Sequence, residues 1–332
     1  MTKILAIGNA LVDIMTSLEN DSLLEKLKLP KGSMQLVDDA TSAKAMESTK
    51  GLKQVLATGG SAANTTNGLS NLGIDSSFIG KVGSDELGKF FRNDMKKNGI
   101  NPILLTGKAP TGRALALVSP DSERTFAVNL GAAIEMVPDD LNEDMFTGYS
   151  YFHIEGYLVQ NHNLIEKALV LAKKAGLIVS LDMASFNVVE ANRDFLKKVI
   201  SNYVDIVFAN EDESKAFTGL SPEESLHALA EMVKIAIVKV GSNGSMIKSG
   251  NEVQKVGVIK VNPIDSTGAG DLYASGFLYG LSKGLSLKQC GSIGAVLSGK
   301  VIEVMGPKMA PETWEIVKKM VTRIIQGEEI VS

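Results

Sequence analysis

The chain has 332 residues, a formal net charge of −4 at pH 7, 44% hydrophobic residues and 22% charged residues. This composition is typical of a globular protein and excludes a long disordered chain, which combines low hydrophobicity with high net charge. The slightly acidic balance, with no Lys/Arg-rich block, argues against nucleic acid as a partner.

The cysteine count and the longest uncharged run narrow the class further. Cys290 is the single cysteine, which excludes a disulfide framework and a Cys-rich zinc site. Residues 54–74 carry no charge but are rich in Gly, Ser, Asn and Thr, whereas a membrane span needs about 20 mostly apolar residues. The N-terminal residues 4–8 resemble a first strand rather than a secretory signal. We expect a soluble, cytoplasmic protein without a membrane partner.

Short apolar runs alternate with amphipathic stretches along most of the chain. The runs that predict strands are 4–8, 76–82, 149–154, 177–182, 204–208 and 235–240. The stretches that predict helices are 85–98, 161–175, 221–233, 270–283, 286–303 and 312–326. Strands that are apolar throughout favour a mostly parallel sheet covered on both faces. The predicted fold class is therefore α/β.

Two segments, 12–38 and 108–131, instead show the alternation of half-exposed antiparallel strands. In the second segment the turn Pro120-Asp121-Ser122-Glu123 predicts a hairpin. These segments form either a small β lid that closes over a substrate or a plain edge hairpin. In the first interpretation, the large domain consists of residues 1–11, 39–107 and 132–332.

The segment Asp265-Ser266-Thr267-Gly268-Ala269-Gly270-Asp271 carries the strongest chemical signal. Its glycines open a helix, where free amides and the helix dipole favour a bound anion. Asp271 in the first helical turn could accept a hydroxyl proton while the amides hold a moving phosphoryl group. The alternative is an aspartate that merely favours a helix start after a glycine turn.

Two further polar segments are candidates for ligand binding. Thr58-Gly59-Gly60-Ser61-Ala62-Ala63-Asn64 enters a helix, and its small residues admit either a ligand or close helix–strand packing. Asn9 and Asp13 follow the first strand, at the sheet edge where ligands bind in open α/β folds, although turn chemistry also explains them. The segment 83–90 imitates a P-loop, but Phe90 has no hydroxyl to bind magnesium. No dinucleotide-binding fingerprint follows the first strand, which argues against a dehydrogenase.

Taken together, these motifs resemble the ribokinase-like (PfkB) family of sugar and nucleoside kinases. The first signature covers Gly59 to Asn64 and 79–88, the second is 265–271, and Asn210-Glu211-Asp212-Glu213 between them matches the family's N-x-x-E element. Segments 8–14, 129–133 and 208–211, and the run from Leu287 and Cys290 to Gly306, are most similar to the adenosine kinase branch. The resemblance implies a three-layer sandwich with a β-sheet lid and transfer of the ATP γ-phosphate to the 5′-hydroxyl of a ribonucleoside.

The resemblance also implies roles for individual residues. Asp271 would be the base, with an anion hole formed by Gly268, Ala269 and Gly270, and Arg124 would reach the phosphates from the lid. The ribose would be held by Asn9, Asp13, Gly60, Ser61 and Asn64. An apolar slot for a purine would consist of Met34, Leu36, Phe126 and Val128, with aromatic walls from Tyr157 and Phe186. Asn210 and Glu213 would organise Mg²⁺ and the phosphates, largely through water. The ATP side would also be lined by Gly241, Ser242 and Thr267. A monovalent cation such as K⁺ would bind near Asp265 and the carbonyls of 301–306.

Three residues depart from the adenosine kinase pattern. Thr267 replaces an Asn of some eukaryotic members, Met34 replaces a Gln of some lids, and Leu158 stands where an aromatic is common. A kinase for inosine or guanosine, ribose, fructose or a keto-sugar acid is therefore the nearest alternative. The other alternative is a nucleotide- or sugar-binding regulator without catalysis. The lid's outer face allows either a monomer or a lid-mediated homodimer.

Overall fold

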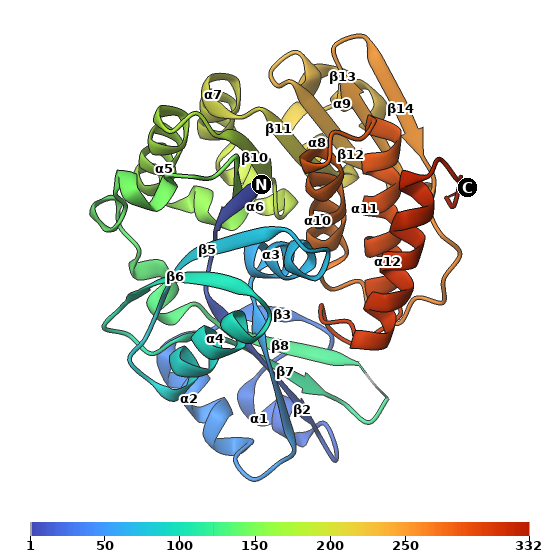
Figure 1. The fold of residues 1–332 in the computed structure, drawn as a ribbon. Coiled ribbons are helices and arrows are strands. Elements are labelled where there is room, and N and C mark those ends of the chain that lie inside the picture. The colour runs from blue at the N-terminus through green and yellow to red at the C-terminus, as the bar shows by residue number, and fades with distance from the viewer. Residues whose placement is uncertain (1, 122, 332) are drawn as a thin grey trace.

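The computed structural model describes residues 2–121 and 123–331, and these form a three-layer body with a smaller sheet beneath it (Figure 1). In this part of the chain the large sheet has nine strands in the order β14-β13-β12-β11-β10-β9-β1-β5-β6. All neighbouring pairs are parallel except the two that involve β13. Their bounds are β1 Lys3–Ile7, β5 Asp75–Val82, β6 Ile100–Thr106, β9 Tyr151–Glu155, β10 Ile178–Asp182, β11 Ile206–Asn210, β12 Ile235–Lys239, β13 Ser245–Ser249 and β14 Glu252–Val256. The predicted α/β class is confirmed.

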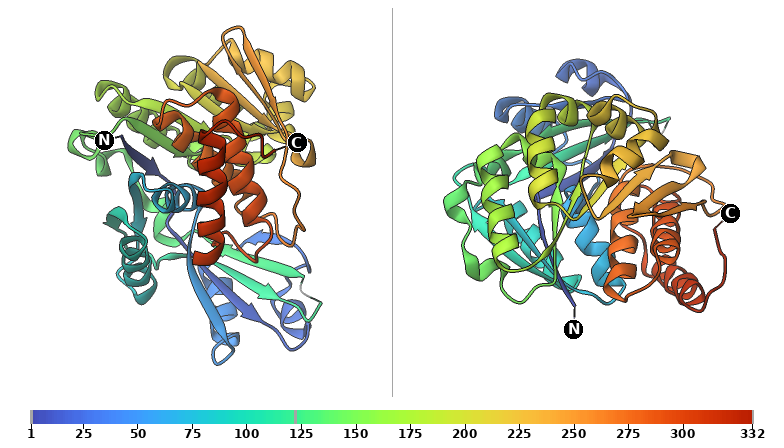
Figure 2. Two further views of the ribbon diagram at one scale, coloured as in Figure 1. Left: turned by 45° about the vertical axis from the view of Figure 1, so that its right-hand side comes forward. Right: turned by 90° about the horizontal axis from the view of Figure 1, so that it is seen from above.

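Helices cover both faces of this sheet because its central strands are apolar on both sides. One buried cluster joins the sheet to α5 (His162–Lys174), α7 (Arg193–Tyr203), α8 (Glu211–Thr218) and α9 (Pro222–Ala230). On the opposite face the clusters include α3 (Ser61–Asn71), α10 (Ala269–Ser282), α11 (Leu287–Val301) and α12 (Pro311–Ile325). The two helical layers are seen in Figure 2. Cys290 is buried in the second layer as a small core residue. In the described part of the chain, no helix is both long and apolar enough to cross a membrane.

The second sheet is the predicted lid, with strand order β3-β8-β7-β2-β4 in the described residues. Its strands are β2 Leu11–Ser17, β3 Met34–Leu36, β4 Gln54–Gly59, β7 Gly112–Val118 and β8 Arg124–Asn129. β7 and β8 form the predicted antiparallel hairpin, although Ser122 of its turn lies outside the described residues. Figure 1 shows this sheet below the large one.

The lid is larger than the sequence pattern indicates. β4 pairs with β2 along six residues, whereas residues 39–107 were expected to lie wholly in the large domain. Two helices also belong to it: α1 (Ser22–Leu27), inside a segment expected to be β, and α2 (Asp39–Ser48). The β4 run is short and ends directly in the Gly59-Gly60 turn, so local sequence does not indicate which sheet it joins.

The outer face of the lid is covered. Val12, Ile14 and Leu117 on that face are buried in one cluster with Leu24 and Ala45 from α1 and α2, and with residues of α4 (Glu86–Lys97). These strands therefore pack against helices on the outer face, where the sequence analysis allowed either solvent or a second lid. The inner face remains open toward the large sheet.

Candidate active site

The lid and the large sheet enclose a cavity of about 1820 Å³ at the carboxyl ends of the parallel strands. Four neighbouring strands, β9 to β12, end there in polar residues: Glu155, Asp182, Asn210 and Lys239. All four side chains line the cavity. Ligands bind at this edge in open α/β sheets because the strand ends and the helix N-termini that follow present polar groups there.

The glycine turn predicted to bind an anion forms one wall of the cavity. Gly268 is the N-cap of α10, with φ of 78°, a left-handed conformation that favours glycine. A Cβ at this position would also lie 2.7 Å from Pro307 Cβ, so the turn requires the missing side chain. The turn thereby presents the free amides of the first turn of α10, and the positive end of its dipole, to the cavity.

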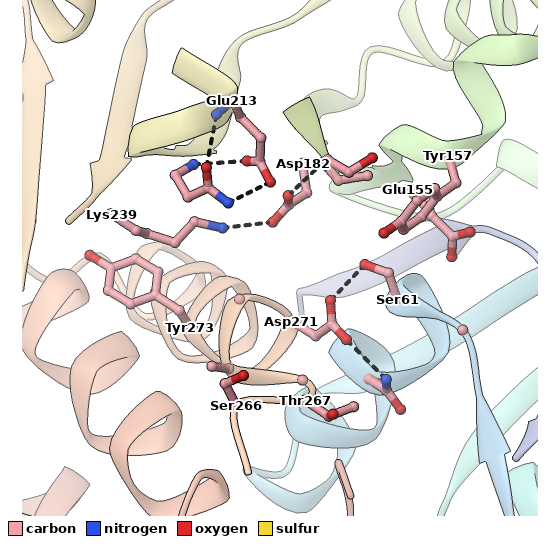
Figure 3. Close-up of a pocket in the computed structure, with 18 of the residues that line it drawn as sticks. Ser61, Glu155, Tyr157, Asp182, Glu213, Lys239, Ser266, Thr267, Asp271 and Tyr273 are labelled. Atoms are coloured by element: carbon pink, nitrogen blue, oxygen red, sulfur yellow. Dashed lines mark hydrogen bonds and ion pairs between the residues drawn. The ribbon is translucent and has the colours of Figure 1, made fainter. Parts of the chain in front are cut away.

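Asp271 lies in the first turn of α10 and faces the opposite wall. Its Oδ1 accepts a 2.6 Å hydrogen bond from Ser61 Oγ, and its Oδ2 accepts a 2.9 Å bond from Asn64 Nδ2 (Figure 3). Burial raises the pKa of Asp271 to about 6, while these two hydrogen bonds oppose that rise. The carboxylate is thus ionised at neutral pH with a pKa suited to accept a hydroxyl proton.

Glu155 at the end of β9 holds the second glycine turn in place. It accepts hydrogen bonds from Asn9 Nδ2 at 2.7 Å and from the Ala62 amide at 3.0 Å. Gly60, which belongs to this turn, has φ of 96°. A Cβ at Gly60 would lie 2.2 Å from the Asn9 carbonyl oxygen. Burial raises the pKa of Glu155 to about 7. The amide of Asn9, expected to bind ribose, is therefore engaged in positioning this turn.

Asp13 and Asn64 line the cavity with oxygen atoms that accept no hydrogen bond from the described residues. The Oδ1 of Asn64 is buried and has no hydrogen-bond partner among the described residues. Burial raises the pKa of Asp13 to about 6, against the attraction of the Lys308 amine. Burial lowers the pKa of Lys308 to about 8. A hydroxyl-bearing ligand would supply the donors that these acceptors lack.

Asn210 and Glu213 form the side of the cavity where the sequence analysis predicts ATP and Mg²⁺. Glu213 Oε1 and Oε2 accept 2.8 Å bonds from the Asn210 side chain and backbone amide, and this capping box starts α8. Burial raises the pKa of Glu213 to about 7, with Lys239 opposing and Asp182 reinforcing that rise. Gly241 and Ser242 line the same side. The sequence did not single out Asp182, Lys239 or Glu155, yet each ends a buried strand, the same signal that identified Asn9 and Asp13.

The lid contributes apolar side chains and one cation. Met34, Leu36, Phe126 and Val128 line the cavity, as the purine-slot prediction requires, and Tyr157 lines it from the large domain. Phe186 does not join them: its ring is 56% exposed at the start of α6 (Phe186–Ala191), which contributes Asn187 and Val188 instead.

Arg124 does not line the cavity and instead ties the lid to the anion loop. Its guanidinium forms a buried ion pair with Asp265 and donates to Thr267 Oγ1 at 3.3 Å. Thr267, expected on the ATP side, also donates from its amide and hydroxyl to Asp265 Oδ1. Asp265 Oδ2 accepts the Gly306 amide at 2.6 Å. The Asp265 carboxylate is thus already neutralised and hydrogen-bonded, which does not fit a monovalent cation held by that side chain.

A resident metal held directly by the protein has no support in the described residues, which contain no group of three or more His, Cys, Asp or Glu side chains arranged to hold one. Asp182 and Glu213 do supply carboxylate oxygens close together, on the side of the cavity that Asn210 lines. Mg²⁺ prefers oxygen ligands and usually keeps several waters. These residues therefore fit a Mg²⁺ ion that arrives with a nucleotide and is held through water.

Comparison with known proteins decides the family. Residues 32–314 match the model of the pfkB family carbohydrate kinases. The chain belongs to this family. It is a kinase, and the ribokinase-like fold is confirmed.

Three relatives illustrate the range of the family. The structure of a probable sugar kinase from Rhizobium etli CFN 42 has a TM-score of 0.85 and 33% identity, and the match covers 96% of this chain and 99% of that chain. The structure of adenosine kinase from Sinorhizobium meliloti has a TM-score of 0.84 and 32% identity over the same shares. A protein named uncharacterized sugar kinase, from Archaeoglobus fulgidus, is 28% identical over 247 residues, which are 73% of this chain and 96% of that protein.

Proposed function

We propose that this kinase transfers the γ-phosphate of ATP to the 5′-hydroxyl of a ribonucleoside, with adenosine as its substrate and AMP and ADP as products. The likeness to adenosine kinase from Sinorhizobium meliloti over 96% of this chain supports this substrate, although sugar kinases are equally similar. The choice between them therefore depends on the acceptor side of the cavity.

The observation that carries the proposal is an apolar slot next to unpaired acceptors. Met34 and Leu36 are 66% and 71% exposed, and both face the cavity together with Phe126. Asp13 and Asn64 lie on the same side with acceptors for hydroxyl groups. A nucleoside fills both parts, because the flat faces of its base pack well against apolar side chains and its ribose carries hydroxyls. Ribose or fructose would satisfy the acceptors but would leave the apolar slot in contact with water.

The charges that line the cavity disfavour phosphoryl acceptors that are themselves negatively charged. Lys239 and Lys260 are the lysines that line the cavity, and both lie on the nucleotide side. The acceptor side instead carries the carboxylates of Asp13 and Glu155. A keto-sugar acid or a sugar phosphate would place its negative charge beside these carboxylates, and the one buried ammonium near them, Lys308, is already attracted to Asp13. An uncharged acceptor is therefore favoured.

The proposed reaction uses the Asp271 carboxylate and the backbone amides of the glycine turn, both of which line the cavity. Asp271 takes the proton of the 5′-hydroxyl as that oxygen attacks the γ-phosphorus. The bond between this phosphorus and the β,γ-bridging oxygen breaks, and ADP leaves with the electron pair. The amides of Gly268, Ala269 and Gly270 stabilise the charge on the transferred group. When bound, Mg²⁺ would neutralise triphosphate charge on the side of Asn210 and Glu213.

The test is a phosphorylation assay with labelled ATP against adenosine, inosine, guanosine, ribose, fructose and a keto-sugar acid. We expect adenosine to give the highest kcat/KM and AMP as the product. The variant Phe126→Ala should raise KM for nucleosides but not for free ribose, because only a base fills the slot. A preference for ribose or fructose would overturn the nucleoside proposal. Ligand binding without a phosphorylated product from any acceptor would favour the regulator alternative.

A further inference from the structure

Lys239 is a partly buried cation that the reaction as described above does not use. It is the last residue of β12 and pairs in register with Asn210, the last residue of β11. Its ammonium is 3.2 Å from Asp182 Oδ2, and the side chains of the two residues are only 16% and 7% exposed. Lys239 therefore lies at the same sheet edge as the nucleotide-binding residues.

The ammonium of Lys239 also lies against the anion loop. A Cβ placed on Gly270 would be 3.1 Å from the Lys239 Nζ atom, so the absence of that side chain gives the ammonium access to the first turn of α10. In Figure 3, Lys239 and Asp271 lie on either side of this turn, and Lys239 points into the same space as Asp182 and Glu213. A phosphoryl group held by the amides of Gly268–Gly270 would have the ammonium beside it.

The surroundings keep this lysine charged. Burial alone would lower the pKa of Lys239, but the carboxylates of Asp182 and Glu213 outweigh burial and raise that pKa above its ordinary value. A buried ion pair is a weak source of fold stability, because the cost of desolvating both charges offsets much of their attraction. A pair that lines a ligand cavity is better explained by a charged ligand than by stability.

We propose that Lys239 is a catalytic residue that binds the transferred phosphoryl group from the sheet side, opposite the amides of the anion loop, and that Asp182 positions it. Lys239 stays protonated throughout: it gives no proton to the phosphoryl group and forms no covalent bond. Its charge offsets the negative charge spread over the phosphoryl oxygens as the bond to the leaving ADP breaks.

The first experiment replaces Lys239 by methionine, which keeps the length of the side chain and removes its charge. We expect kcat to fall roughly 10²–10³-fold, with KM for the nucleoside unchanged within about threefold. The matched control is Lys234→Met, because Lys234 directly precedes the same strand and is an exposed lysine that pairs with Asp205. The control should keep its kcat and KM.

The second experiment separates phosphate binding from simple neutralisation of Asp182. The kcat of Asp182→Asn is compared with that of the double variant Asp182→Asn/Lys239→Met, in which both charges of this ion pair are removed and Glu213 keeps its hydrogen bonds from Asn210. If Lys239 only neutralises Asp182, its loss has no further effect once residue 182 is uncharged, and equal kcat values would overturn the proposal. If Lys239 binds the phosphoryl group, its loss costs about 10²-fold on this background too.

A binding measurement completes the test without turnover. ADP with Mg²⁺, nucleoside and aluminium fluoride imitates the charge of the group in transfer, whereas ADP with Mg²⁺ alone does not. We expect Lys239→Met to lose most of the gain in ADP affinity that aluminium fluoride produces in the wild-type kinase. An equal gain in the folded variant would overturn the proposal. If the phosphorylation assay identifies another acceptor, that acceptor replaces the nucleoside in the mixture, so a failed nucleoside assay leaves this test interpretable.

Discussion

Ser61 Oγ donates a 2.6 Å hydrogen bond to Asp271 Oδ1 across the cavity, although the two residues are 210 positions apart in the chain. This bond joins the first turn of α3 to the first turn of α10, so each glycine turn fixes the geometry of the other. It also directs the Asp271 carboxylate away from its own helix and into the space where an acceptor hydroxyl would lie (Figure 3).

The variant Asp271→Asn should lower kcat by roughly 10²–10⁴-fold, because an amide cannot take the hydroxyl proton. The fold should survive. Asn64 has a buried Oδ1 without a partner, so its amide can rotate and accept from the new Nδ2 group. Turnover is measured by ADP release, and Tm by calorimetry. Near-normal turnover by the folded variant would remove Asp271 from the mechanism.

The acid limb of the pH profile should reflect the raised pKa values of the site. Asp271 and Asp13, each with a pKa raised to about 6 by burial, must both be ionised to accept hydroxyl groups. We expect kcat/KM to be constant near neutral pH and to fall below pH 6, with a limiting slope that exceeds one proton. A profile flat down to pH 4.5 would contradict the raised pKa of the base.

Asp13 and Asp271 should affect stability in the direction opposite to their effect on activity: they support activity when ionised but stabilise the fold when protonated. Because their pKa values are higher in the folded than in the unfolded state, the folded state binds more protons between pH 4 and 6. Their contribution to the free energy of unfolding is therefore greatest below pH 4 and is lost as the pH rises through 6. The loss is measured as the difference in Tm between Asp271→Asn and the wild type. The Tm of the variant minus the Tm of the wild type should be larger at pH 7 than at pH 4.5, and the opposite trend would contradict the prediction.

The variant Glu155→Gln should destabilise the Gly60 turn, because both Glu155 oxygens accept hydrogen bonds and glutamine offers one acceptor oxygen. Leaving a buried donor unpaired costs about 1–3 kcal/mol. We expect a lower Tm and a lower kcat/KM together, since Ser61 follows that turn. The control is Glu143→Gln, at an exposed ion pair with Lys174. Unchanged Tm and kcat/KM for Glu155→Gln would show that the turn does not depend on this residue.

The variant Arg124→Met should release the lid from the anion loop. It removes the ion pair with Asp265 but leaves the hydrogen bonds that Thr267 and Gly306 donate to that carboxylate. We therefore expect an intact loop with a more mobile lid, seen as faster amide hydrogen exchange in β7 and β8, and a lower kcat. Arg323→Met, at an exposed pair with Glu328, is the control. Equal exchange rates in the variant and the wild type would show that Arg124 does not hold the lid.

Much of the fold was predictable because its signals are local. Apolar runs identified β1, β5 and β9 to β12, and alternation identified the β7–β8 hairpin. The membership of β4 in the lid was not predictable, because a short strand carries no mark of its partner. The covering of the lid by α1 and α2 was also missed, since α1 is a short helix within a segment of β-like pattern.

The candidate site, like the fold, could be predicted from the sequence only in part. The sequence alone indicated the glycine turn before α10 and singled out Asp271 as a candidate base, because glycine spacing and a helix start act on neighbouring residues. Only the tertiary structure decided that Glu155, Asp182 and Lys239 join the site and that Phe186 does not. Those placements depend on strand order and on the packing of α6, which arise from contacts between segments far apart in the chain. Local sequence determines the conformation and the side chains of each segment, whereas tertiary packing determines which segments come into contact.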